Sequence, residues 1–241
     1  MISKSEAKKV RLLHQKKYRD ESGIFIAEGP KVVHELLNSS YKLISLFATK
    51  EFIPKSRNHA LSEITEKELS SVSCLSTPNQ VIGLFEIPVH KTDVRSLQDQ
   101  LVIALDDIRD PGNLGTIIRI ADWFGIKHIL CSDTCVEAYN PKVVQATMGS
   151  IARVQVQSGN LQKLLKDFKR VYAAVLDGKN IYKENLADNG AILIGNESRG
   201  ISKALMNLVT HPVSIPNFSA GADSLNAAVA AAVICSEFKR K

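Results

Sequence analysis

Short apolar runs alternate with segments of helical periodicity along the chain, most regularly from residue 101 onward. Six runs are typical of buried strands, at 101–105, 128–131, 154–156, 171–176, 191–195 and 213–216. Five segments between or after them are predicted as helices, at 114–124, 141–148, 161–168, 201–208 and 224–238. Strands that alternate with helices indicate an α/β fold with a mostly parallel sheet and helices on both faces.

The first part of the chain has a less regular pattern. We expect a basic helix over 5–19 and a second helix over 30–37, which begins at Pro30 directly after Gly29. Short strands are expected at 24–27, 43–48 and 81–86. A polar stretch over 88–100 is typical of a connector. We therefore predict a small α/β domain over 1–90, a linker over 91–100 and a second domain over 101–241.

Composition and charge narrow the class of protein. Of 241 residues, 44% are hydrophobic and 23% are charged, which is typical of a globular protein and excludes a disordered chain. The formal net charge is +6, and residues 1–20 hold seven basic side chains against two acidic ones. This excess favours a polyanionic partner that contacts the start of the chain. The alternative is that this segment is a solvated amphipathic helix.

No segment has the features of a membrane span or a secretory signal. The longest apolar run, 227–235, is about half of the roughly 20 residues that a spanning helix needs. The first residues are charged where a signal peptide is apolar, so we expect a cytoplasmic protein with four reduced cysteines. The spacing of Cys131 and Cys135 suggests a metal site, but no second close Cys or His pair accompanies it. We expect no metal.

Polar and glycine-rich residues follow three of the predicted strands. These junctions, at 105–115, 194–200 and 215–226, are the places to look for a site, because the ligand crevice of an open parallel sheet lies outside the carboxyl ends of its strands. On the helix over 114–124, Arg119 lies roughly opposite the core stripe, with Ile120 and Trp123 on its side. Two interpretations stay open for it: a solvated surface arginine, or part of a surface that binds a partner.

Three motifs occupy these junctions in order: Asn113-x-Gly115-x-x-x-Arg119, Gly195-Asn196-Glu197-x-x-Gly200, and Ile215-Pro216 followed by Ser224-Leu225-Asn226. Together they resemble the SpoU/TrmH family of RNA ribose 2′-O-methyltransferases, of the SPOUT superfamily, over about residues 101–238. The link over 217–223 departs from the family pattern, in which a Met-containing link is frequent. This departure affects the local shape of a cofactor loop more than the reaction class.

The start of the chain resembles a second element of the same family. A pattern that includes Lys16, Arg19, Gly23 and Phe25 is similar to the L30e-like substrate-binding domain that precedes the catalytic domain in many members. The resemblance implies that this domain binds RNA. We predict phosphate contacts by Lys16, Lys17 and Arg19.

The resemblance also implies a fold and a cofactor. The expected catalytic domain has a C-terminal trefoil knot, forms a homodimer and binds S-adenosylmethionine in its knotted loops. Gly195, Ile215 and Leu225 are the expected cofactor-binding residues, largely through backbone groups. Further residues expected to line the cofactor are Leu176, Gly200 and Pro216.

Arg119 is the catalytic arginine by this resemblance. The residues expected to shape the site around it are Asn113, Glu197, Ser224 and Asn226. Two roles stay open for Arg119. It is either the general base, although a guanidinium is normally protonated near pH 7, or an anchor for the adjacent RNA phosphate that stabilises charge on the ribose oxygen.

The expected function is methylation of one ribose 2′-hydroxyl in structured RNA, with 23S ribosomal RNA as the leading substrate. A transfer RNA is the alternative substrate. A catalytically silent RNA-binding or ribosome-assembly protein is the alternative from another class, and binding of S-adenosylmethionine distinguishes it from an enzyme.

Overall fold

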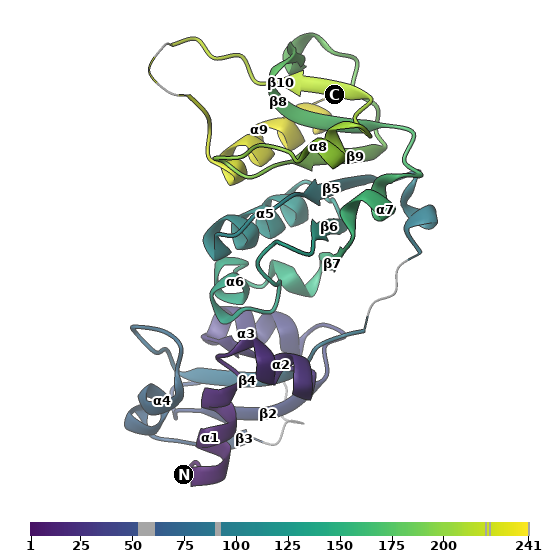
Figure 1. Cartoon of the computed structure of the whole chain (residues 1–241). Coiled ribbons are helices and arrows are strands. Elements are labelled where there is room, and N and C mark those ends of the chain that lie inside the picture. Colours follow the sequence, from purple (N-terminus) through teal and green to yellow (C-terminus); the bar gives the residue numbers. More distant parts are fainter. Residues whose placement is uncertain (53–60, 90–92, 220, 222, 241) are drawn as a thin grey trace. The chain divides into compact units, whose positions relative to one another are not determined.

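The computed structural model describes residues 1–52, 61–89, 93–219, 221 and 223–240 (Figure 1). This part of the chain has an α/β fold, as the alternation of strands and helices predicts. It forms two compact units. The first consists of Met1–Val89 with Ala138–Arg153, and the second of His90–Glu137 with Val154–Lys241.

The first unit contains a four-stranded sheet with the order β1-β4-β2-β3. β4 is antiparallel to β1 and to β2, and β3 is parallel to β2. The elements of this unit from residues 1–89 are α1 (Lys4–Leu12), α2 (Lys16–Ser22), β1 (Ile24–Glu28), α3 (Pro30–Leu37), β2 (Leu43–Ala48), β3 (Leu61–Glu63), α4 (Glu66–Val72) and β4 (Val81–Glu86).

Local signals explain most of these elements. The single helix predicted over 5–19 is instead two helices: α1 ends at Leu12, and after a short turn α2 begins at Lys16. Along β1, Phe25 and Ile26 alternate between two apolar clusters, so this sheet is buried on both faces. The hydrophobic pattern misses α4, although its capping box of Thr65 and Glu68 is a helix-start signal that the sequence contains.

A later segment of the chain returns to the first unit. It contains α6 (Pro141–Ala146) and a 3₁₀ turn, η2 (Ser150–Ala152). Val144 and Ile151 join the apolar cluster around Phe25, and the Tyr139 and Tyr41 hydroxyls are 3.1 Å apart. The helix predicted over 141–148 is therefore present, but nothing in the hydrophobic pattern indicates this return.

The second unit is built on a six-stranded parallel sheet with the order β10-β8-β9-β5-β6-β7. All six predicted strands are present; the strand over 101–105 has its predicted bounds, and the other five have shifted ends. The elements of this unit are η1 (Val94–Leu97), β5 (Leu101–Leu105), α5 (Pro111–Trp123), β6 (His128–Ser132), β7 (Gln155–Gly159), α7 (Leu161–Leu165), β8 (Val171–Asn180), η3 (Ile181–Lys183), β9 (Gly190–Ile194), α8 (Lys203–Met206), β10 (His211–Ser214) and α9 (Ala227–Lys239).

The central strand β5 is buried along its whole length. Val102 and Ala104 pack with Leu161 of α7 and Leu205 of α8, whereas Ile103 and Leu105 are buried on the other face. A strand buried on both faces requires cover on both sides of the sheet, as predicted. α5 packs against α9 and so joins two segments that are far apart in the sequence (Figure 1).

The last strands pair in an unusual register. Pro212 of β10 pairs with Ala173 of β8, but the next residue, Val213, pairs with Lys179. A side chain at Gly178 would overlap the Val213 backbone, so only glycine allows this approach. The trefoil knot in this region stays a prediction. Among the described residues, no helix is both long enough and apolar enough to span a membrane.

Candidate functional site

The three predicted motifs meet through one side chain, Asn113. It lies in the first turn of α5, where the Asp110 carboxylate caps the helix by accepting from the Asn113 N–H at 2.8 Å. The Asn113 side chain donates to the Glu197 carboxylate and accepts from Asn226 Nδ2 at 2.9 Å. One amide therefore links the loop after β5, the loop after β9 and the start of α9. We call Asn113, Glu197 and Asn226 the amide network.

Asn226 holds its place because it has two tasks. Its side-chain oxygen caps α9 by accepting from Ala228 N–H at 2.9 Å and from Val229 N–H at 3.3 Å. Its amide nitrogen remains to donate to Asn113. The cap of the last helix thus also positions a motif residue. Ser224 and Leu225 precede the helix and are exposed.

The loop that carries Glu197 is held by its own backbone. Asn196 and Gly200 exchange two hydrogen bonds, of 3.2 and 2.9 Å, and Gly200 has a φ of 67°, which favours glycine. A side chain at Gly195 would overlap the backbone of Gly200. The Asn196 side chain also donates to the Asp107 carbonyl at 2.9 Å. Both motif glycines are therefore needed for the shape of this turn.

Two aspartates after β5 bind the same loop from the other side. The Asp106 carboxylate accepts from the Ser202 N–H at 2.8 Å. Asp107 has a φ of 58°, and its carboxylate accepts from Arg109 Nε at 2.7 Å and lies 3.7 Å from Arg199 Nη1. The hydrogen bond from Arg109 lowers the pKa of the Asp107 carboxyl. Asp106, Asp107, Arg109 and Arg199 lie in two of the strand-end junctions that the sequence indicates, but the sequence gives them no role in the site, because aspartates after a strand are common in turns.

The remaining predicted cofactor residues come from three places: Leu176 lies within β8, Ile215 and Pro216 directly follow β10, and Leu225 precedes α9. Ser214 Oγ donates to the Gly178 carbonyl at 2.9 Å, which places the part of β8 after Leu176 beside the residues that precede Ile215 and Pro216. Ile215 and Pro216 are half-buried. Leu176 and Leu225 are large apolar side chains that remain 76% and 47% exposed.

Arg119 is not part of the amide network. It lies six residues after Asn113 on α5, which is roughly 9 Å along the helix axis and about 120° around it. Its side chain is exposed on the same stripe as Trp123, which is 85% exposed. In the part of the chain that the structure describes, the side chain of Arg119 has no hydrogen bond or ion pair. A single protomer therefore leaves this residue apart from the motif residues that it was expected to join.

The predicted RNA contacts in the first unit need one correction. Arg19 is only 1% exposed and donates to the Leu13 carbonyl at 2.6 Å, so it supports the turn between α1 and α2 rather than a surface for phosphates. Lys16 and Lys17 are exposed, but they face Asp20 at 2.6 Å and Glu21 at 3.9 Å. The charge count could not separate a buried arginine from an exposed one.

Comparison with known proteins gives matches to both parts of the chain. Residues 100–236 match the SpoU rRNA Methylase family, and residues 4–83 match the MRM3-like substrate binding domain. The 23S rRNA (guanosine(2553)-2′-O)-methyltransferase RlmP of Bacillus subtilis is 30% identical over 230 residues, which cover 92% of this chain and 91% of that protein.

Solved structures are similar over almost the whole chain. A TrmH-family protein from Porphyromonas gingivalis superposes with a TM-score of 0.90 at 35% identity, covering 99% of this chain and 98% of that one. The AdoMet-bound rRNA methyltransferase from Sinorhizobium meliloti gives a TM-score of 0.86 at 29% identity, covering 99% and 96%.

Proposed function

Since the chain belongs to the SpoU rRNA methylase family, a family of RNA methyltransferases, we propose that it methylates one ribose 2′-hydroxyl of 23S ribosomal RNA with S-adenosylmethionine as the donor. The observation that carries this proposal is the amide network, in which Asn113, Glu197 and Asn226 bring the three motifs of the family together. The relative from Bacillus subtilis, which is named for this reaction, supports the choice of ribose and of RNA.

The residues present fit this cofactor. Leu176 and Leu225 expose apolar surface that a purine ring can cover, and the backbone at Gly200 has open space around it. Glu197 supplies a carboxylate, which suits a positively charged ligand. When bound, S-adenosylmethionine supplies an electrophilic methyl group. We assign its binding to Gly195, Ile215 and Leu225, with Leu176, Gly200 and Pro216 around it.

Arg119 has the role of an anchor in this proposal. A guanidinium stays protonated near neutral pH, so it is suited to hold the RNA phosphate next to the target ribose and to stabilise negative charge that develops on the 2′-oxygen. The proton of the hydroxyl then leaves to that phosphate or to water. Asn113, Glu197, Ser224 and Asn226 shape the site by holding the loops in place.

A homodimer completes the site. Trp123 on α5 and Val229 on α9 are exposed apolar residues on two helices that pack against each other, and such a surface is typical of a protein interface. Arg119 lies one turn from Trp123, so a second copy that covers Trp123 also contacts the region of Arg119. In the first unit, Lys16 and Lys17 are the proposed RNA contacts. A cytoplasmic location stays a prediction.

The test is methyl transfer by the full chain from radiolabelled S-adenosylmethionine to 23S ribosomal RNA from a strain that lacks the gene. The proposal predicts label in one 2′-O-methylated nucleoside after complete RNA digestion. Label in a base, or in transfer RNA instead of 23S RNA, contradicts it. Calorimetry with S-adenosylmethionine serves as a second measurement, because a silent RNA-binding protein gives no heat of binding.

A further inference from the structure

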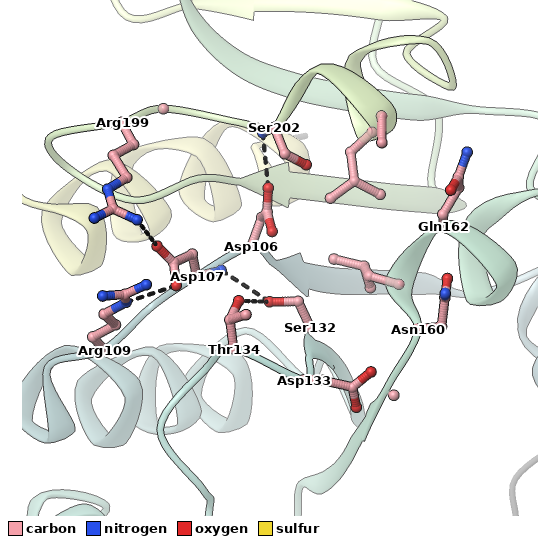
Figure 2. Close-up of a pocket in the computed structure, with 15 residues that line it drawn as sticks. Asp106, Asp107, Arg109, Ser132, Asp133, Thr134, Asn160, Gln162, Arg199 and Ser202 are labelled. Carbon is pink, nitrogen blue, oxygen red and sulfur yellow. Dashed lines mark hydrogen bonds and ion pairs between the residues drawn. The ribbon is translucent and has the colours of Figure 1, made fainter.

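A cavity of about 520 Å³ lies at the carboxyl ends of the strands of the second unit (Figure 2). Its volume is in the range of pockets that bind small molecules. The lining comes from the loops after β5, β6, β7 and β9, and Gly200 is the one lining residue that the sequence analysis assigns to a site. Asn113, Glu197 and Asn226 do not line it. The cavity is therefore separate from the amide network.

The position of this cavity in the fold favours a binding site. From β5 the chain continues outward through β6 and β7, and it then crosses to place β8, β9 and β10 on the other side. The direction of the sheet thus reverses between β5 and β9. Open α/β sheets bind ligands outside the strand ends at such a reversal. Asp106 and Asp107 after β5, and Arg199 after β9, line the cavity at this point.

Two arginines at one side of the cavity share a single carboxylate. Figure 2 shows Arg109 and Arg199 pointing toward Asp107; Arg109 Nε lies 2.7 Å and Arg199 Nη1 lies 3.7 Å from the carboxylate oxygens. The arginine side chains are 58% and 70% exposed, whereas that of Asp107 is 15% exposed. At this side the two guanidiniums exceed the Asp107 carboxylate by one positive charge, and most of their donors remain free of Asp107. Two further carboxylates line the cavity: Asp106 is 6% exposed and accepts from the Ser202 N–H, and Asp133 lies at the opposite side. The arrangement of the two arginines suits a phosphate group.

The opposite side of the cavity has amide and carboxylate groups in place of the arginines. Asn160, Gln162 and Asp133 lie there in Figure 2, whereas Ser132 and Thr134, whose hydroxyls are 2.9 Å apart, lie beside Asp107. Amide and carboxylate groups are the partners that proteins use for the edges of unstacked RNA bases. A charged pair on one side and polar groups on the other match the two ends of a nucleotide, its phosphate and its base.

We propose that this cavity binds one nucleotide of the RNA substrate, with its phosphate on Arg109 and Arg199 and its base against Asp133, Asn160 and Gln162. The nucleotide is a neighbour of the methylated one, because the cavity contains none of the amide network. This inference rests on the proposed function, since RNA is the ligand. The pocket would thus select the substrate by a nucleotide that is not itself modified.

The first experiment measures binding to the cavity without RNA. The four nucleoside 5′-monophosphates and the matching nucleosides are titrated into the full chain, and the amide NMR signals of Asp107, Gly159 and Ser202 are followed. We expect the monophosphate that binds most tightly to bind about tenfold more tightly than the matching nucleoside. The double variant Arg109→Ala/Arg199→Ala is expected to lose that difference. Equal binding of the nucleoside and the monophosphate by the wild type would overturn the phosphate assignment.

The second experiment measures the RNA. The double variant is expected to raise the KM for 23S ribosomal RNA about tenfold, while the affinity for S-adenosylmethionine measured by calorimetry stays within about twofold. A matched control removes two exposed lysines that precede β6 and β8 at the amino ends of the strands, as Lys127→Ala/Lys169→Ala. We expect this control to leave the KM for RNA within about twofold of wild type. This control shows how much of the change in KM comes only from the loss of two positive charges, which weakens RNA binding in general.

A third variant tests the base side. Gln162→Ala combined with Asp133→Asn is expected to change which of the four monophosphates binds most tightly. The roughly tenfold difference in affinity between a monophosphate and its nucleoside should remain. If monophosphates bind as expected but the KM for RNA does not change in the arginine variant, the pocket serves free nucleotides and the RNA assignment is wrong. If no RNA is methylated by the wild type, the proposed function fails, whereas the nucleotide titration still shows whether the pocket binds nucleotides.

Discussion

The two ends of α5 differ in how many contacts their side chains make within a single chain. At the first end, Asp110 caps the helix and Asn113 bonds to both Glu197 and Asn226. At the other end, Arg119 and Trp123 are exposed. The first end is completed by the folding of a single chain. The second presents a cation and an aromatic ring to another molecule, so we expect the chemistry to depend on what binds there.

The largest effect is expected from Arg119→Ala. Loss of a group that stabilises transition-state charge typically lowers turnover about 100- to 1,000-fold. Because Arg119 is apart from the amide network, the affinity for S-adenosylmethionine in calorimetry should change little. Arg119→Lys, which keeps a charge but loses the planar donor pair, should recover part of the activity. Turnover near wild type in Arg119→Ala would remove the residue from the site.

Trp123→Glu tests whether a second copy covers the exposed end. A buried charge without a partner disrupts an interface, so we expect sedimentation velocity to show a dimer for the wild type and a monomer for the variant. Methyl transfer should fall with the loss of the dimer and recover in part at high protein concentration. The variant chain should still fold, as circular dichroism can check, because Trp123 is exposed in a single chain, but its unfolding temperature should be lower than that of the wild type because dimerisation stabilises the folded state. A variant that is still dimeric would contradict the proposed interface.

Asn113→Ala tests the completed end. This change removes one donor and one acceptor that link three loops; because both hydrogen bonds are solvent-exposed, the free energy of unfolding should fall by only about 0.5–1.5 kcal/mol. We expect weaker binding of S-adenosylmethionine together with lower turnover, in contrast to Arg119→Ala. Chemical denaturation and calorimetry on the same samples measure both effects. Unchanged cofactor affinity would mean that the network does not shape the cofactor loops.

The smallest expected effect is on the reactivity of the Cys135 thiol, which lies next to the loop after β5. Cys135 Sγ accepts from the Ile108 N–H at 3.3 Å, and a hydrogen bond from Cys131 lowers the pKa of the Cys135 thiol to about 7. Burial raises the pKa of Cys235 to about 12. Alkylation by iodoacetamide should therefore occur first at Cys135, with a rate that rises through pH 7 and levels off above it. Mass spectrometry of the peptides identifies the modified thiol.

The strands and the three motifs could be predicted from the sequence because both depend on local patterns. Buried parallel strands give apolar runs, and the motif residues follow those runs directly. One feature of the fold could not be predicted this way. The return of residues 138–153 to the first unit depends on contacts such as Tyr139 with Tyr41, far apart along the chain.

Individual side chains were harder to predict than elements. A count of charges treats Arg19 and Lys16 alike, although tertiary packing buries the first and exposes the second. Asp107 has the ordinary features of a turn residue, and its contact with Arg199 exists only because β5 and β9 are neighbours in the sheet. Such roles depend on strand order, which the sequence pattern leaves open.

The most direct test of the central claim is to map 2′-O-methylated riboses in total RNA from strains with and without the gene. The account predicts that one ribose in 23S ribosomal RNA loses its methyl group in the deletion strain. It also predicts that the wild-type gene restores this methyl group and that the Arg119→Ala gene does not. An unchanged methylation map in the deletion strain, or restoration by the Arg119→Ala gene, would contradict it.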